Sequence, residues 1–175
     1  MRKFVGPAGA VSRITIESQA LKDNLLGDPS ERAVDVYVPA GHDGRGLPLL
    51  VDLVGFTSSG LSHTNWVGFR ENLPERLDRL IGEGTMPPVV VAFPDCFTRL
   101  GGNQYINSAA TGSWEDFLLH EMLPEIERRF GCVAAAAAAA CSPRVPAGTA
   151  RSRTRCAIPR FVSVVRVFET TSWVK

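Results

Sequence analysis

Apolar and polar residues alternate over two short segments near the start of the chain, 11–16 and 33–38. This period of two is typical of β-strands that bury one face against a core. Two later segments, 47–54 and 87–93, are almost continuously apolar, as in strands that are covered on both faces of a sheet. The pattern therefore predicts four strands, of which the last two lie inside a layered fold.

Two helices are predicted from apolar residues at helical spacing, one over about 69–82 and one over 114–130. Pro74 must lie in the first turn of the first helix or kink it, because an interior proline removes a backbone hydrogen bond. Ser113 is the predicted N-cap of the second helix, with an acidic residue three positions on as a weak capping box. Pro124 lies inside this helix and is predicted to bend it.

Buried strands that are joined through helices imply a parallel sheet with helices on its faces, so the predicted fold class is α/β. We expect a mixed sheet that is antiparallel over residues 11–38 and parallel where 48–54 meets 89–93. The helix over 114–130 should pack on one face of this sheet.

The composition is that of an ordinary soluble globular protein. Of the 175 residues, 45% are apolar and 21% are charged, and the net charge is +1. This balance favours neither a nucleic-acid partner nor a disordered chain. No segment approaches the run of about 20 apolar residues that spans a membrane, and the basic start of the chain is not followed by the apolar stretch of a secretory signal. We therefore expect a cytoplasmic protein that binds neither nucleic acid nor membranes.

The cysteines show no pairing pattern. None of them forms a CxxC motif or has the spacing of metal ligands, so they are predicted to be free thiols in a reducing compartment. No metal and no cofactor is predicted. The four residues are Cys96, Cys132, Cys141 and Cys156.

The composition changes abruptly at a run of seven alanines, 134–140. Residues 134–175 hold seven basic residues and one acidic residue, a net charge of +6, whereas residues 1–133 hold 12 basic and 17 acidic residues, a net charge of −5. We therefore divide the chain into a domain over 1–133 and an Ala/Arg-rich tail over 134–175. The tail does not continue the α/β pattern and is expected to be poorly ordered or irregular.

Ligands bind at the carboxyl ends of the strands in open α/β sheets, and two loops begin there. The first, 53–60, is rich in glycine and serine, and the second, 94–113, is long enough to suggest a function. A glycine-rich loop after a buried strand can cradle an anion, supply one half of an oxyanion hole, or form an ordinary tight turn. It is not a phosphate-binding P-loop, because no GxxxxGK[ST] motif occurs in the chain.

The order of these segments resembles that of the esterase branch of the α/β-hydrolases, which includes S-formylglutathione hydrolases, feruloyl esterases and siderophore esterases. The resemblance lies in LPLLVDLVGFTSSG, in PPVVVAFPD and in residues 105–130, and it covers about residues 11–132. It implies a truncated α/β-hydrolase-like fold and hydrolysis of a small-molecule carboxylic ester by a serine nucleophile.

The resemblance also implies where the site lies. The first loop usually reads His-Gly in this family, and here Val54 takes the place of the histidine, which changes how the loop is held. Gly55 and Phe56 are the predicted oxyanion hole, with the Phe56 backbone N–H as donor. Trp66 and Tyr105 are predicted to line an acyl or aromatic pocket, with core packing as the alternative.

Asn107, in the Asn-Ser pair that the family typically has here, is the third predicted substrate contact. His63 and His120 are interpreted as a loop residue and an exposed helix residue. Asp95 is expected to order its loop, while Asp52 is an unusual acid inside a buried strand.

The family's nucleophile lies on a G-x-S-x-G turn after the strand that follows helix 114–130, and the acid and histidine come later. No G-x-S-x-G motif occurs in the chain, and residues 134–175 contain neither Asp nor His. No catalytic residue is therefore assigned. The chain is predicted to be inactive towards short p-nitrophenyl esters, and its sheet to have an unpaired apolar edge.

A shifted reading frame accounts for the tail. Read out of frame, residues 146–152 permit Ser-Gly-Gly-Tyr-Gly-Ala-Ile, and residues 153–161 permit Ala-His-Ala-Met-Arg-His-Pro-Glu-Val. These sequences resemble the family's nucleophile turn and the helix after it. Two hypotheses remain for the function: an inactive esterase half-domain, or a non-catalytic binding module built on the same sheet.

Overall fold

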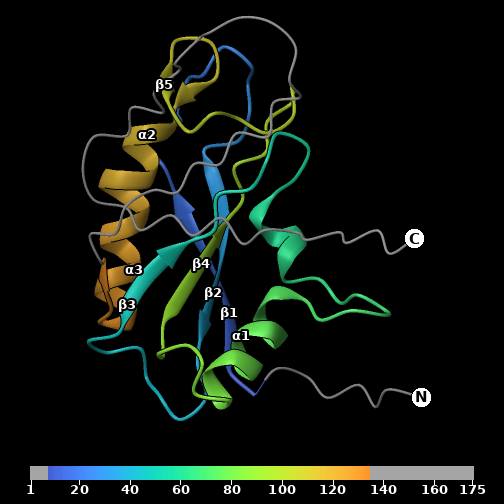
Figure 1. The fold of residues 1–175 in the computed structure, drawn as a ribbon. Helices are drawn as coiled ribbons and strands as arrows, with labels where there is room; N and C mark the ends of the chain where they lie inside the picture. Colours follow the sequence, from blue (N-terminus) through green and yellow to red (C-terminus); the bar gives the residue numbers. More distant parts are fainter. Residues whose placement is uncertain (1–7, 135–175) are drawn as a thin grey trace, which may run out of the picture.

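The computed structural model describes residues 8–134, which form a five-stranded mixed sheet between helical layers (Figure 1). The strand order is β1-β2-β4-β3-β7, and a small hairpin of β5 (Asn107–Ser108) and β6 (Gly112–Ser113) lies apart from it. The sheet strands are β1 (Ala10–Glu17), β2 (Glu31–Val38), β3 (Pro48–Val51), β4 (Val90–Pro94) and β7 (Val133–Ala134). The tail predicted over 134–175 lies outside the described residues, apart from Ala134.

The strand directions confirm the prediction from sequence. β1 and β2 are antiparallel, as are β2 and β4, whereas β3 and β4 are parallel with Leu50 opposite Val91. The chain then adds β7 parallel to β3, with Val133 opposite Pro48. The edge of β3 that was expected to be unpaired is thus covered at Pro48 and Leu49.

Two apolar cores lie on the two faces of the sheet. The larger core packs the helical layer of α2 (Trp114–Asp116), η2 (Phe117–Met122) and α3 (Leu123–Phe130) against alternate residues of β1 to β4. The smaller core packs α1 (Leu73–Gly82) against Tyr37, Val91 and Phe93 on the opposite face. Because strand residues alternate between faces, neighbours such as Val36 and Tyr37 belong to different cores.

Helix α1 begins at Leu73, four residues later than predicted. Asn72 caps it by accepting a hydrogen bond from the Glu75 N–H, and the Glu75 side chain accepts one from the Asn72 N–H, each at 2.9 Å. This capping box fixes the start of the helix. Pro74 lies in the first turn, where its missing N–H costs no helical hydrogen bond.

The predicted helix 114–130 is present, but six of its residues, η2, form a π-helix that ends at Met122, two residues before Pro124. In a regular α-helix, a proline ring collides with the backbone carbonyl group four residues earlier. Here the α-helix is interrupted on this side of the proline by a π-helix, which has a wider turn. The irregularity found before Pro124 is thus a π-helix, and the predicted bend itself stays a prediction.

The predicted N-cap position of this helix, Ser113, is confirmed, although the capping hydrogen bond comes from another residue. The Ser113 side chain makes no capping hydrogen bond, and Ser113 pairs instead with Asn107 in the small hairpin. The Asn107 Oδ1 atom accepts the hydrogen bond of the Asp116 N–H at 3.1 Å. The cap thus comes from a residue nine positions earlier, which a local capping rule does not find.

Candidate functional site

The loop between β3 and η1 (Gly60–His63) leaves the carboxyl end of the sheet. Asp52 N donates to Ala92 O at 2.9 Å, so pairing with β4 continues one residue beyond β3. Ser59 then caps η1: its Oγ atom accepts from Leu61 N at 3.4 Å and donates to Asp95 Oδ1 at 2.9 Å. Asp95 Oδ1 also accepts from Phe97 N at 3.2 Å, so this carboxylate orders both loops, as expected.

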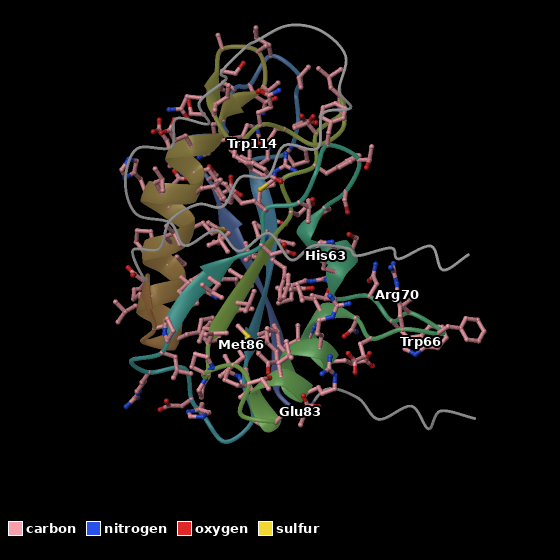
Figure 2. All side chains as sticks on the ribbon, in the orientation of Figure 1. His63, Trp66, Arg70, Glu83, Met86 and Trp114 are labelled. Atoms are coloured by element: carbon pink, nitrogen blue, oxygen red, sulfur yellow. The ribbon has the colours of Figure 1, made fainter. Side chains whose placement is uncertain are left out.

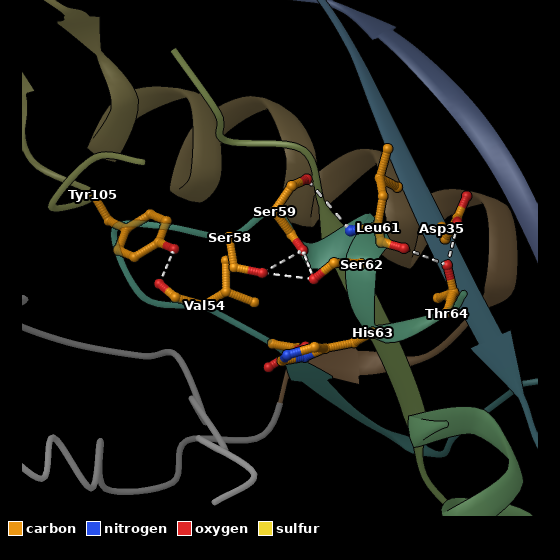
Figure 3. Close-up of polar contacts among 10 residues, drawn as sticks. Asp35, Val54, Ser58, Ser59, Leu61, Ser62, His63, Thr64 and Tyr105 are labelled. Carbon is orange, nitrogen blue, oxygen red and sulfur yellow. Dashed lines mark hydrogen bonds and ion pairs between the residues drawn. The ribbon is translucent and has the colours of Figure 1, made fainter. Parts of the chain in front are cut away.

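The two predicted site loops meet at this end of the sheet. Gly102 N donates to Phe56 O at 2.7 Å, and Tyr105 Oη donates to Val54 O at 2.5 Å (Figure 3). A Cβ atom on Gly102 would lie 2.8 Å from Phe56 O, so only glycine permits this approach. The expected convergence of 55–56 with the loop 95–107 is confirmed.

These contacts also show how the loop is held where Val54 takes the place of the family's histidine. The carbonyl groups of Val54 and Phe56 accept hydrogen bonds from the second loop, which fixes the peptide units on both sides of Gly55. Within residues 8–134, the Phe56 N–H donates to no acceptor in hydrogen-bond range. A backbone donor held on both sides in this way is the kind of group that can stabilise an oxyanion.

The three predicted substrate contacts lie in different places. Tyr105 is half-buried beside Val54, with φ of 59°, a backbone conformation that non-glycine residues rarely adopt. Asn107 is exposed and caps the helical layer through Asp116. Trp66 is 65% exposed on a loop that projects from the body of the molecule (Figure 2). The structure therefore brings only Tyr105 together with Gly55 and Phe56.

An Asp–His pair beside the loop was missed by sequence reasoning. His63 Nδ1 contacts Asp52 Oδ2, and the Asp52 side chain is only 3% exposed. Two signals were available: an acid inside an apolar strand, and a histidine at the end of the loop that follows it. Neither signal shows from the sequence alone that the two side chains meet, because the loop between them has no regular period.

A second buried carboxylate anchors the same segment. Asp35 on β2 accepts a hydrogen bond from Thr64 Oγ1 at 2.9 Å and two from Arg13, at 2.6 and 2.9 Å. Thr64 directly follows His63 and is the C-cap of η1. The end of η1 is thus tied to two neighbouring parts of the sheet, through Asp35 and Asp52.

The loop hydroxyl groups interact with one another. Ser58 Oγ and Ser62 Oγ lie 2.6 Å apart, and Ser62 Oγ donates to Ser59 O at 2.7 Å (Figure 3). The Ser62 proton is therefore engaged by a backbone carbonyl. Among residues 8–134, these two hydroxyl groups thus contact each other and a carbonyl group, and not an imidazole or carboxylate that could act as a base.

The two described cysteines are free and buried, as predicted, whereas Cys141 and Cys156 lie outside the described residues. Burial raises the pKa of Cys96, which follows β4 at the site, and raises that of Cys132 to about 11. The reactive form of cysteine is the thiolate. These thiols are therefore protonated at neutral pH and supply no nucleophile.

Within residues 8–134, no three His, Cys, Asp or Glu side chains are grouped so that they could hold a metal ion. The same residues contain no helix whose length and apolar character would allow it to cross a membrane.

The close fit of η1 on β4 gives a direct test of this geometry. A Cβ atom on Gly60 would lie 2.6 Å from Pro94 O and 2.8 Å from the Phe93 carbonyl carbon, and both are backbone atoms. We expect Gly60→Ala to lower the free energy of unfolding by about 1–3 kcal/mol, measured by urea denaturation. The control is Gly82→Ala, where a Cβ atom meets nothing within 4 Å and helix propensity should give a small gain. Equal effects of the two changes would contradict the described packing.

No protein-family profile matches the sequence, and a search of curated protein sequences gave no significant match. Several solved esterase structures do match the described fold. One is a ferulic acid esterase with 20% sequence identity, which covers 72% of this chain and 45% of its own, with a TM-score of 0.54. Another is a ferulic acid esterase of Anaeromyces mucronatus in complex with ferulic acid, with 16% identity, coverage of 77% and 47%, and a TM-score of 0.50.

This chain spans less than half the length of these esterases. At such low identity the likeness shows the fold: residues 8–134 adopt part of the α/β-hydrolase fold, which confirms the predicted fold class.

Proposed function

We propose that the described residues form the oxyanion-hole half of a serine carboxylic-ester hydrolase, and that this 175-residue chain does not carry out the serine-dependent reaction. The observation that supports the first part is the convergence of the two loops around Phe56. Gly102 and Tyr105 hold the carbonyl groups on both sides of Gly55, and the Phe56 N–H has no acceptor among residues 8–134.

In acyl transfer the carbonyl oxygen of the ester becomes negatively charged as the nucleophile attacks. A backbone donor that is already fixed needs no reorganisation at that moment, and one such donor contributes about 10²- to 10³-fold in rate. The proposed substrate is a small-molecule carboxylic ester, a class that the esterase neighbours support. Tyr105 is the predicted substrate contact that we retain, because it lies beside Val54 in the same loop cluster.

The absence of a nucleophile motif supports the second part of the proposal. In the family that the sequence resembles, the nucleophile follows the strand after the helical layer, and β7 occupies that place beside β3. No G-x-S-x-G motif follows β7 in the sequence. The proposed cause is the shifted reading frame after about residue 133.

Pre-steady-state kinetics with p-nitrophenyl acetate test this proposal. A serine esterase acylates quickly and shows a burst of p-nitrophenol equal to the enzyme concentration. We expect no burst from the purified chain, and we expect Ser58→Ala to leave its slow linear rate unchanged. A stoichiometric burst that Ser58→Ala abolishes would refute the proposal. Tight ester binding without any rate would instead favour the non-catalytic binding module.

A further inference from the structure

We propose that Asn103 and Tyr105 are positioning residues for the oxyanion donor, and that they form a brace from the end of β4 to the loop that carries Phe56. This inference rests on the proposed oxyanion site. It goes further because it assigns a role to Asn103, which the sequence did not single out, and because it gives Tyr105 a second role besides that of a substrate contact.

The oxyanion donor lies in a turn whose carbonyl groups are held. The Phe56 N–H and the Gly55 carbonyl belong to one planar peptide unit, so a partner on the carbonyl also fixes the direction of the N–H. Ser58 N donates to Gly55 O at 3.1 Å, within the same turn. Tyr105 Oη donates to the preceding carbonyl, Val54 O, at 2.5 Å, and thus anchors the start of the turn from a different loop.

The side chain of Asn103 links this anchor to the sheet. Its Nδ2 atom donates to Cys96 O at 2.6 Å, two residues after β4 ends, and its Oδ1 atom accepts from Tyr105 N at 2.6 Å. An amide side chain suits this place because it offers both a donor and an acceptor. Asn103 also follows Gly102, whose N–H donates to Phe56 O at 2.7 Å, so one short segment holds the turn at both ends.

The backbone of Tyr105 is held in an unfavourable conformation. Its φ of 59° lies in the left-handed region, which costs energy for a residue with a large side chain. Such a conformation persists only where the surrounding contacts require it, and it is common at functional sites. Here the contact with Asn103 holds the backbone, and the phenol ring points back to Val54 (Figure 3). The unusual backbone is therefore what brings the hydroxyl group to the oxyanion turn.

Loosening the brace should act on the orientation of the donor. A backbone N–H stabilises an oxyanion only while it points at the place that the negative oxygen occupies. The apparent affinity for a ligand falls with the fraction of molecules in the competent conformation. Asn103 and Tyr105 therefore set how much of the population presents the Phe56 N–H to an acceptor, and they do so through Val54.

NMR titration of the ¹⁵N-labelled 175-residue chain with sodium acetate at constant ionic strength tests the brace. The acetate carboxylate stands in for the oxyanion, and a charge-assisted hydrogen bond to it should move the Phe56 amide proton downfield in a saturable way. Tyr105→Phe removes only the hydroxyl group and should weaken the affinity for acetate at Phe56 by about fivefold, the contribution of one hydrogen bond. Asn103→Ala should weaken it by a similar factor, although its hydrogen bonds go to Cys96 and Tyr105.

Tyr37→Phe is the matched control, because the chain has only two tyrosines and the Tyr37 hydroxyl donates to Asp78 Oδ1 at 2.7 Å in the smaller core. It should lower the urea midpoint and leave the affinity for acetate unchanged. The ¹⁵N order parameter of the Phe56 N–H separates positioning from stability. It should be near 0.85 in the unchanged chain and in Tyr37→Phe, and should fall below about 0.6 in Tyr105→Phe and Asn103→Ala.

An affinity and an order parameter that stay unchanged in either Tyr105→Phe or Asn103→Ala would overturn the inference, because the brace needs both residues. An equal loss of both quantities in Tyr37→Phe would also overturn it, since the effect would then follow stability alone. A Phe56 amide that does not respond to acetate in the unchanged chain would instead refute the proposed oxyanion donor, so the two failures are distinguishable.

Discussion

Restoring the reading frame after codon 133, together with the C-terminal half that the esterase family supplies, should raise p-nitrophenyl acetate turnover by at least about 10⁴-fold over the 175-residue chain. The nucleophile and its base act as a unit, so a half-site with neither retains only residual catalysis. The reading out of frame permits Ser-Gly-Gly-Tyr-Gly over part of residues 146–152, and this serine is the expected nucleophile.

The control is the same restored chain with this serine changed to alanine, which should return to the residual rate. Sequencing the gene across codons 130–165 shows independently whether one base has been gained or lost. A restored chain that folds, with all three triad positions present, and is no more active than the 175-residue chain would contradict the proposed origin of the tail.

Trp114→Ala should lower the free energy of unfolding by about 3–5 kcal/mol, the usual cost of removing a buried aromatic side chain. Trp114 is 1% exposed and packs edge-on against Phe117 with ring centroids 5.8 Å apart. Its indole N–H donates to Thr111 O at 2.8 Å, and the Arg32 guanidinium lies 4.8 Å from its ring centroid. The substitution therefore leaves both a cavity and a buried cation without its aromatic partner.

Trp66→Ala is the matched control, because this side chain is 65% exposed on a projecting loop. It should change the stability by less than about 0.5 kcal/mol. Urea denaturation measures both effects on the same scale. Similar losses for the two variants would contradict the assignment of Trp114 to the core between the sheet and the helical layer.

The strands could be predicted because their signals are periodic and local. Segment 11–16 alternates, segment 87–93 is continuously apolar, and both correspond to strands with the predicted directions. The start of α1 was placed too early because apolar spacing does not mark a boundary, whereas the capping box of Asn72 and Glu75 does. Ser113 was correctly placed at the N-cap of the helical layer, but the capping hydrogen bond comes from Asn107, which reaches the helix from a hairpin.

The candidate site was only partly predictable, for a related reason. Gly55 and Phe56 follow a buried strand, and sheet topology alone brings the next loop to the same end. The contact between Asp52 and His63 depends on how an aperiodic loop turns back into η1, which no sequence period encodes. Trp66 was predicted at the site from its residue type. A large aromatic side chain does not show by itself whether it lies in the site or on a loop that projects into solvent.

The central claim is that this chain has an oxyanion half-site and no activated serine. Intact-mass spectrometry after incubation with an alkyl fluorophosphonate tests it most directly, because this reagent forms a stable adduct with activated serines. We expect the mass of the 175-residue chain to remain unchanged under conditions that label an active serine esterase completely. A stoichiometric adduct that peptide mapping assigns to a serine of the site loop, such as Ser58, Ser59 or Ser62, would contradict the claim.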